Sequence, residues 1–327
     1  MHAAEPVVSI TIVAYNSGEQ LPDCLSAIRP ALRASFAELI VVDNASPDDS
    51  ATIVARQCPE ALLLRSTSNR GFAGGCNLAW SKVRGRYWLL LNPDVVAPPD
   101  GIGQLVEWLD RRPDFGAASP QLIGTSGELH ATHRRFPSVW RTAVELVSLA
   151  PGLRGGPPHD ARAAHDCEAD WIPGAAMLIR REAVERAGLM SEAFFMYGED
   201  VEWCWRIRRA GFRIGVAEAI RFRHAAGGSA IRTWGERQWY ERMWAGWYHA
   251  CRLTRGRLHG RALLVVSTLA LAADAFLAPR ESVRQRAARR DLAIHLRLLR
   301  GVGHDAEAAV AVRQQHPPRG DRPARLH

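Results

Sequence analysis

Short continuous runs of hydrophobic residues alternate with helically spaced ones along the first part of the chain. Leu21, Leu25, Ile28 and Leu32 recur at helical spacing and predict an amphipathic helix. The continuous runs predict strands buried on both faces, at residues 7–14, 39–42, 61–64 and 87–91. Strands and helices that alternate at this spacing form parallel βαβ units with right-handed crossovers. Ligands bind such sheets at the carboxyl ends of the strands.

The pattern is less regular after residue 100 and changes again after residue 230. Helices are predicted at 101–111 and 182–187, strand-like runs at 129–132, 171–180 and 213–217, and a mobile connection at 152–166. From Trp234 onward, Trp and Tyr alternate with Arg; an apolar run then covers 262–279, and a basic amphipathic helix with Leu292, Leu296 and Leu299 along one face covers 280–300. We therefore predict a domain over 1–230, a helical region over 231–300 and a disordered tail over 301–327.

Polar residues follow the predicted strands where a ligand would bind. Asp94 ends the segment Asn92-Pro93-Asp94, directly after the fourth strand. An acid there is well placed to hold a divalent metal that bridges a diphosphate, although an Asp that caps the next turn also fits. The glycine-rich segment 69–77 would let backbone N–H groups approach a phosphate, and an ordinary turn is the alternative. His224 is a candidate metal ligand or an ordinary surface or core histidine.

An acidic and aromatic segment, FFMYGEDVEWCWRIRR, covers residues 194–209. Glu199, Asp200 and Glu202 lie there among aromatic residues, and acids beside aromatic walls are held ready for base catalysis when their pKa is shifted. The alternative is a helix start, because acids are favoured in a first turn and Arg206 lies four residues after Glu202. The segment alone does not decide between the two.

Composition restricts the class of protein. The 327 residues are 47% hydrophobic and 23% charged, as in a globular protein. The six cysteines are spread out without a CxxC pair, which argues against a zinc or disulfide framework and favours a reducing, cytoplasmic compartment. The first ten residues lack the pattern of a signal peptide.

Charge points to an anionic surface as partner. The net charge is +8, and the excess of arginine lies after about residue 200. Basic, aromatic and amphipathic features together fit helices that lie at a membrane interface. A packing domain whose Trp residues form a core is the alternative. Nucleic acid would also suit a basic segment, but we do not expect it as a partner.

Seven motifs in this order closely resemble glycosyltransferase family 2. They are SITIVAYN, VVDNASPDDS, NRGFAGGCN, LLLNPD, IPGAAMLIRR, FFMYGEDVEWCWR and HAAGGS. The likeness covers about residues 6–230 and is greatest to the branch of bacterial rhamnosyltransferases of cell-wall and O-antigen assembly. It implies an α/β fold of GT-A type, with a Rossmann-like, mostly parallel central sheet flanked by helices and a C-terminal helical extension. It also implies transfer of a sugar from a nucleotide diphosphate donor with inversion.

The resemblance implies a role for each matching residue. On the donor side, the residues that border the nucleotide and its phosphates are Tyr15, Asn16, Asp43, Asn69, Gly71, Phe72, Gly75 and Asn92. Asp94 stands at the second acid of the DxD motif and is the expected ligand of Mg²⁺ or Mn²⁺; Asn92 replaces the first acid, and His224 completes the metal site. Glu199-Asp200 matches the ED pair, with Asp200 as general base and Arg206 holding the acids.

On the acceptor side, Trp171 and Gly174 are expected to line the pocket. Met190-Ser191-Glu192 replaces the family's Phe-Asp-Glu, which we expect to affect packing more than chemistry. The predicted function is inverting transfer from dTDP-rhamnose or a UDP-sugar to a glycan or polyprenyl-diphosphate-linked acceptor. The reaction is expected at the inner face of the cell membrane, where the protein makes peripheral contact with the membrane. The sequence leaves open whether the protein forms an oligomer. The alternative is a non-catalytic nucleotide-sugar-binding or scaffold subunit.

Overall fold

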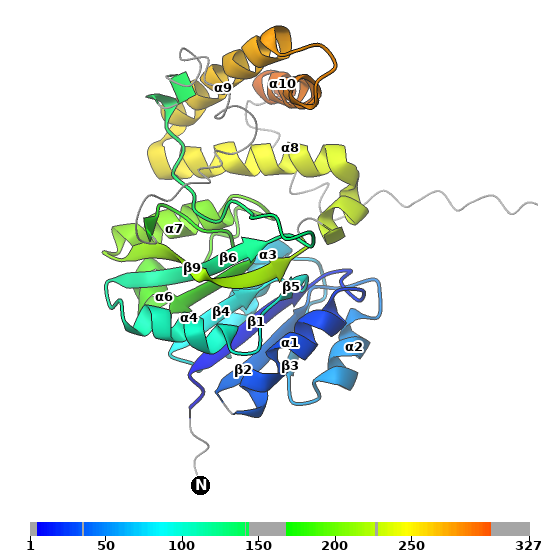
Figure 1. Cartoon of the computed structure of the whole chain (residues 1–327), viewed down its shortest axis with the longest axis vertical. Helices are drawn as coiled ribbons and strands as arrows, with labels where there is room; N and C mark the ends of the chain where they lie inside the picture. The colour runs from blue at the N-terminus through cyan, green and yellow to red at the C-terminus, as the bar shows by residue number, and fades with distance from the viewer. Residues whose placement is uncertain (1–4, 35, 141, 144–167, 226–227, 302–327) are drawn as a thin grey trace, which may run out of the picture.

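The computed structural model describes residues 5–34, 36–140, 142–143, 168–225 and 228–301. Within these ranges a central sheet is covered by helices on both faces, and a layer of long helices lies beyond one end (Figure 1). The mobile connection expected at 152–166 and the tail expected after Gly301 lie outside the described residues.

In the described part of the chain the sheet has nine strands in the order β3-β2-β1-β4-β8-β6-β9-β5, with β7 paired to β9. Their bounds are β1 Val8–Ala14, β2 Ala37–Asp43, β3 Leu62–Arg65, β4 Tyr87–Leu91, β5 Val95–Val96, β6 Phe115–Ile123, β7 Glu168–Ala169, β8 Ala176–Arg180 and β9 Arg213–His224. The four strands β3, β2, β1 and β4 are parallel, as predicted. Strand β1 pairs with β2 in continuous register from Val8↔Ala37 to Ala14↔Asp43. The other half is mixed, because β8 runs antiparallel to both β4 and β6.

The helices between residues 21 and 209 divide between the two faces of the sheet. Their bounds are α1 Leu21–Arg33, α2 Ser50–Gln57, α3 Gly71–Trp80, α4 Gly101–Asp110, α6 Arg181–Ala187 and α7 Glu199–Arg209. Buried residues of α1, α2 and α4 share one hydrophobic core with the alternate residues of β1, β2 and β4. Buried residues of α3, α6 and α7 form the second core on the opposite face. The result is a three-layer α/β/α arrangement.

Two predicted strands differ from the structure, and one strand of the structure was not predicted. The run at 129–132 forms only an isolated bridge between Leu129 and Ile123, not a strand. The run at 171–180 becomes a strand only at Ala176, because β4 pairs with β8 from there on. Strand β6 was not predicted, since FGAASPQLI combines Gly, Ser and Pro, which have low strand propensity; burial between β8 and β9 outweighs it.

The C-terminal helices are α8 Gly228–Arg255, α9 Arg257–Leu277 and α10 Val283–Gly301. Helix α8 lies between the α/β/α layers and the pair α9–α10 (Figure 1). Trp244, Trp247 and Tyr248 of α8 are buried, and the Tyr248 hydroxyl lies 2.8 Å from His295 Nε2 of α10. Burial lowers the pKa of His295 to about 4, so this contact is between neutral groups. These aromatic residues form a packing core, which was the alternative to a membrane role for them.

The leucine face of α10 is not the face that packs within the protein, and its expected place at a membrane interface stays a prediction. Ala288, Asp291, Ile294 and His295 are buried, whereas Leu296 and Leu299 are exposed. Of the helices in the described part of the chain, α9 alone is long and apolar enough to cross a membrane by length and composition, a test that core helices of soluble proteins also pass.

Candidate active site

The carboxyl ends of β1, β2 and β4 meet at one edge of the sheet, because these strands are parallel. The edge therefore collects the residues that follow each strand: Tyr15, Asn16, Asp43, Asn44, Asn92 and Asp94. Asp43 is mostly buried, and its Oδ1 accepts a hydrogen bond from Ser46 N–H (3.0 Å). Asn16 has φ 51°, in the left-handed region, and its N–H donates to Ser46 Oγ (3.3 Å). The turn after β1 is thus tied to the turn after β2.

The glycine-rich segment is the first part of helix α3, not a loop ahead of it, because the helix begins at Gly71. Gly71 has φ 72°, and a Cβ there would overlap the Phe195 carbonyl oxygen. That oxygen accepts a hydrogen bond from Phe72 N–H (2.9 Å), which joins the start of α3 to the acidic segment. Gly75 packs against Val13 of β1, where a Cβ would also overlap.

Asn44 was missed by sequence reasoning, and it holds the start of α3 in place. Its Nδ2 donates to Asn69 Oδ1 and to the Gly71 carbonyl (both 3.0 Å), and its Oδ1 accepts from Arg70 N–H (3.0 Å). Asn69 Oδ1 also accepts from Gly71 N–H (2.9 Å). Asn69 therefore shapes this segment through hydrogen bonds within the protein, and its expected role beside the nucleotide stays a prediction. A buried Asn directly after a strand-ending Asp was the available signal.

Asp94 and His224 come together although they are 130 positions apart. The cause is the antiparallel pairing of β5 with β9, in which Val95 is the partner of His224. His224 Nε2 lies 3.4 Å from Asp94 Oδ1, and both side chains are nearly buried. The ring of His130 contacts the ring of His224 edge-on, with 5.6 Å between centroids.

These two residues fit a divalent metal. Neither Asp94 Oδ1 nor His224 Nδ1 has a hydrogen-bond partner among the described residues, although both atoms are buried. A buried polar atom without a partner is costly unless a ligand supplies one. Within the described ranges no three His, Cys, Asp or Glu side chains gather into a metal-binding cluster. Mg²⁺ is commonly held by one or two protein carboxylates together with substrate phosphates.

Glu199 and Asp200 begin helix α7, as the predicted base and its neighbour. The turn before them is strained: Tyr197 has φ 73° and Gly198 has φ 97°. Asp200 Oδ2 accepts a hydrogen bond from Gly174 N–H (3.3 Å), and Oδ1 accepts one from Val201 N–H (2.8 Å). A Cβ on Gly174 would lie 3.0 Å from Phe72 and 3.9 Å from the Asp200 Cβ, so Gly174, Phe72 and Asp200 are neighbours.

The environments of the two acids separate their protonation states. Burial first, and the Asp200 charge second, raise the pKa of Glu199 to about 8. Burial also raises the pKa of Asp200, but the two backbone N–H donors and the charge of Arg134 act in the opposite direction. Glu199 Oε2 is buried without a hydrogen-bond partner in the described structure. The two N–H donors and Arg134 thus favour the charged form of Asp200, whereas burial and the Asp200 charge disfavour that of Glu199, so Asp200 is the better candidate for the carboxylate of the pair.

Arg206 does not hold these acids, contrary to the expectation. Its guanidinium pairs with Glu202 (2.7 Å and 2.8 Å) and donates to the Ala187 and Leu189 carbonyls. The helix-start alternative is therefore correct for Glu202, which is a structural residue. Glu192, which matches the family's Glu, accepts hydrogen bonds from Asn77 Nδ2 (3.1 Å) and Arg70 (3.2 Å). Met190, which replaces the family's Phe, is buried in the core on this face of the sheet. The expectation that the departure affects packing more than chemistry stays a prediction.

Arg134 is a second residue that sequence reasoning missed. Its guanidinium lies over the Trp171 ring, 5.3 Å from the centroid, and its charge acts on Asp200. Burial lowers the pKa of Arg134 to about 10, which still leaves it cationic at neutral pH. Trp171 is buried, with Trp247 of α8 5.6 Å away. Arg134 and Trp247 both lie against the Trp171 indole, so Trp171 helps to position Arg134. The expected role of Trp171 in binding the acceptor stays a prediction. A basic Arg-Arg pair ahead of Phe136 was the only signal.

The model of glycosyl transferase family 2 matches residues 9–186. The chain belongs to glycosyl transferase family 2. The matched residues include the ends of β1, β2 and β4, with Asp43 and Asp94. The family expected from the motifs is confirmed.

Family 2 relatives include rhamnosyltransferases, which confirms the expected branch. The N-acetylglucosaminyl-diphospho-decaprenol L-rhamnosyltransferase of Mycobacterium tuberculosis (strain ATCC 25618 / H37Rv) is 28% identical over 223 residues, or 63% of this chain and 71% of that protein. The rhamnosyltransferase WbbL of Escherichia coli (strain K12) is 24% identical over 207 residues, which is 57% of this chain and 77% of that protein. The low-salt glycan biosynthesis hexosyltransferase Agl10 of Haloferax volcanii is 27% identical over 217 residues. The match spans 65% of this chain and 65% of that relative.

A solved structure with the same fold is the mannosyltransferase PcManGT from Pyrobaculum calidifontis, in complex with GDP-Man and Mn²⁺. Its TM-score is 0.55 at 21% identity, and the alignment covers 95% of this chain and 87% of that one. At this identity the likeness establishes the fold alone. Together with the family match it confirms the expected GT-A type.

Proposed function

We propose that this protein is an inverting glycosyltransferase that moves a sugar from a nucleotide diphosphate donor to a glycan or lipid-linked glycan acceptor. The observation that carries the proposal is Asp200. It belongs to a buried acid pair, its two carboxylate oxygens each accept a hydrogen bond from a backbone N–H group, and it adjoins Phe72 at the start of α3. A single displacement with inversion needs one carboxylate that removes the acceptor proton and none that attacks the sugar.

Asp200 takes the proton of the acceptor hydroxyl in this proposal. Its two N–H donors hold both carboxylate oxygens in place, and the neutral Glu199 beside it avoids a second negative charge. Arg134 keeps Asp200 ionised in a buried setting. The Gly174 N–H that orients Asp200 comes from the segment before β8, so the sheet itself supports the base.

The donor diphosphate is proposed to lie at the carboxyl ends of β1, β2 and β4. Asp94 and His224 would hold Mg²⁺ or Mn²⁺ there, with Asn92 as a neutral neighbour. Bound metal would neutralise the leaving diphosphate. Asp43 would accept a hydrogen bond from the base or ribose, next to Tyr15 and Asn16. The solved relative was complexed with GDP-Man and Mn²⁺, which supports a metal-assisted nucleotide-sugar site of this type.

The donor and acceptor are proposed by similarity. Two relatives are named rhamnosyltransferases, and one of them is named for an N-acetylglucosaminyl-diphospho-decaprenol acceptor. This supports dTDP-rhamnose, with a UDP-sugar as second choice, and an acceptor carried on a polyprenyl diphosphate. A lipid-linked acceptor places the reaction at the inner face of the cell membrane. No feature of the described site favours the scaffold alternative.

Thermal stabilisation by nucleotides tests the donor site directly. A ligand that binds only the folded protein raises Tm by mass action. We expect dTDP or UDP to raise Tm with Mn²⁺ or Mg²⁺ and to do so much less in EDTA, whereas ADP has little effect. Asp94→Asn should lose the metal-dependent part. The control Asp114→Asn changes an exposed acid paired with Arg213, remote from the site. Absence of any nucleotide effect on folded protein would contradict the proposal.

A further inference from the structure

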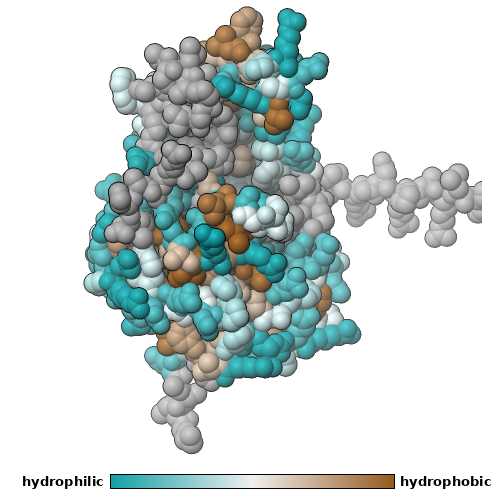
Figure 2. Space-filling model, viewed as in Figure 1, coloured by the Kyte–Doolittle hydropathy of each residue, from teal (hydrophilic) through white to brown (hydrophobic). Residues whose placement is uncertain are grey.

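The exposed hydrophobic residues of this protein are concentrated in the helical layer. Nine of the twelve exposed large hydrophobic side chains in the described structure lie between Leu253 and Leu299. The space-filling view shows hydrophobic residues at that end of the molecule, next to strongly hydrophilic ones (Figure 2). A monomeric soluble protein rarely gathers exposed apolar surface in this way, so a partner is expected there.

Helix α9 carries the most regular part of this surface. Its exposed apolar residues are Leu277, at the end of the helix, and a regular series that consists of Leu258, Ala262, Val265, Leu269 and Phe276. The steps of four, three, four and seven positions put them on one side of the helix. Phe276 is 86% exposed and Leu258 is 82% exposed. We call this stripe the outer face of α9.

The opposite side of α9 is packed within the protein. Leu263, Leu264 and Leu271 are buried, and α9 packs against α8 and α10. Asp274, near the C-terminal end, is 1% exposed and forms an ion pair with Arg284 of α10. A helix that crossed the bilayer would have to leave these contacts or carry a buried acid into hydrocarbon, which is costly. This geometry therefore fits a helix lying in the membrane interface, not one spanning the bilayer.

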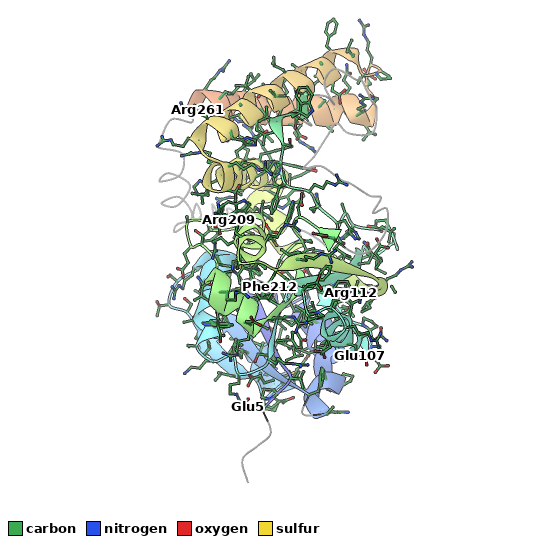
Figure 3. All side chains as sticks on the ribbon, turned by 90° about the vertical axis from the view of Figure 1, so that its left-hand side faces the viewer. Glu5, Glu107, Arg112, Arg209, Phe212 and Arg261 are labelled. Atoms are coloured by element: carbon green, nitrogen blue, oxygen red, sulfur yellow. The ribbon has the colours of Figure 1, made fainter. Side chains whose placement is uncertain are left out.

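The charge around the outer face selects an anionic surface. Residues 234–301 contain thirteen arginines and five acids, an excess of eight that equals the net charge of the whole chain. Arg257 and Arg261 are exposed at the start of α9, and Arg280 is exposed just after its end. Arg261 lies on α9 in the helical layer, far from Glu5 at the other end of the molecule (Figure 3). Two copies meeting through this face would bring like charges together, so a second copy is disfavoured.

Trp140 adds an aromatic side chain near the same end of α9. It is 76% exposed, and it lies three positions after Pro137, whose backbone is hydrogen-bonded to the His259 side chain of α9. Trp favours the boundary between lipid and water, because its ring is apolar and its N–H is polar. The first turns of α9 are therefore flanked by arginine and tryptophan.

We propose that the outer face of α9 docks in the plane of an anionic lipid bilayer, with Leu258, Leu269 and Phe276 inserted among the lipids and the flanking arginines at the head groups. Helix α8 lies between α9 and the sheet, so docking leaves the acid pair of α7 on the water side of the layer (Figure 1). The docking itself does not depend on the chemistry of the site. The benefit of docking, access to an acceptor carried on a lipid, rests on the proposed function.

Vesicle flotation of the full chain tests the proposal. We expect binding to phosphatidylcholine vesicles that contain phosphatidylglycerol, weaker binding to phosphatidylcholine alone, and weakening with salt. Leu269→Glu should lower the partition coefficient about tenfold or more, because it replaces an inserted apolar side chain with a charge. The matched control is Leu62→Glu on β3, since Leu62 is 43% exposed and Leu269 is 55% exposed. The control should float like the wild type, and all three should share one Tm within a few degrees.

Three results would overturn the inference. Equal flotation of Leu269→Glu and wild type would show that the outer face of α9 does not contact the bilayer. Resistance of membrane-bound protein to alkaline carbonate would indicate a spanning helix. A dimer that Leu269→Glu converts to a monomer, without flotation of the wild type, would identify a second copy as the occupant. Transfer to a water-soluble acceptor should be the same in Leu269→Glu and wild type. Flotation without transfer by any variant would contradict the proposed function and leave this inference standing.

Discussion

Gly246 of helix α8 packs directly on the backbone carbonyl of Tyr197, two residues before Glu199. A Cβ at Gly246 would overlap that carbonyl, and a Cβ at Gly198 would overlap the Gly246 carbonyl in turn. The Tyr197 hydroxyl also accepts a hydrogen bond from Trp239 Nε1 of α8 (2.7 Å). Helix α8 therefore packs directly against the strained turn at Tyr197 and Gly198 that precedes the acid pair.

Gly246→Ala should disturb that turn and reduce transfer. Inside a helix, Gly→Ala normally stabilises by about 0.5–1 kcal/mol. Here the overlap with Tyr197 outweighs this gain, so we expect a lower Tm and a lower kcat. Gly103→Ala is the matched control, because Gly103 is also helical and a Cβ there has open space. It should leave kcat unchanged and raise Tm slightly. Equal behaviour of the two variants in melting and initial-rate measurements would contradict this role for α8.

Glu199→Gln should make the stability less dependent on pH. The pKa of Glu199 is raised from 4.5 to about 8 in the folded protein. The neutral form is therefore favoured by folding, and this contribution is complete below about pH 4.5 and is lost as pH rises through about 8. Gln keeps the neutral shape at every pH. Its Tm should match the wild type at pH 4.5 and exceed it increasingly up to pH 9, while the exposed control Glu182→Gln follows the wild type throughout.

The sequence predicted the parallel half of the sheet well, because uninterrupted β-branched runs such as residues 7–14 carry a strong local signal. It also predicted which residues stand at the strand ends. The contact between Asp94 and His224 was expected from the resemblance alone, since it depends on β5 pairing with β9, and strand pairing at that separation has no local pattern. Arg134 and Asn44 were missed for the same reason: each acts through contacts with distant residues.

The assignment of Arg206 failed for a different reason. Its spacing from Glu202 and its proximity to the acid pair in sequence allowed two partners, and only the helix geometry selects one. The Trp-rich helix shows the same limit. Its composition fits a membrane surface and a core equally, whereas in the structure Trp247 faces Trp171 and the exposed apolar side chains lie on α9.

Arg134→Gln should shift the acidic limb of the pH–rate profile to higher pH. The guanidinium and the N–H groups of Gly174 and Val201 oppose the rise in the pKa of Asp200 that burial causes. Without the cation the base is protonated at a higher pH, so kcat should fall most on the acid side and recover as pH increases. Arg134→Lys keeps the charge and should retain most of the wild-type profile. A uniform loss across pH in both variants would indicate a packing role only.

His224→Ala should weaken metal-dependent nucleotide binding by about 10–100-fold, as loss of a metal-site side chain commonly does. His224 lies against Asp94, and its Nδ1 has no hydrogen-bond partner among the described residues. His133→Ala is the control, since His133 is also nearly buried and pairs with Glu218. Titration calorimetry with Mn²⁺ and dTDP or UDP measures the change. Unaltered affinity in His224→Ala would place the metal elsewhere.

Asp200→Asn and Glu199→Gln form an isosteric pair that separates the two acids. If Asp200 is the base, Asp200→Asn should lower kcat by about 10²–10⁴-fold, the usual contribution of general-base catalysis, while nucleotide binding is kept. Glu199 is protonated at neutral pH, and Gln mimics that state, so Glu199→Gln should keep kcat within about tenfold of the wild type. Initial rates at pH 7 with saturating donor decide the matter. A larger loss in Glu199→Gln than in Asp200→Asn would reverse the assignment, because the ionised acid of the pair would then be Glu199.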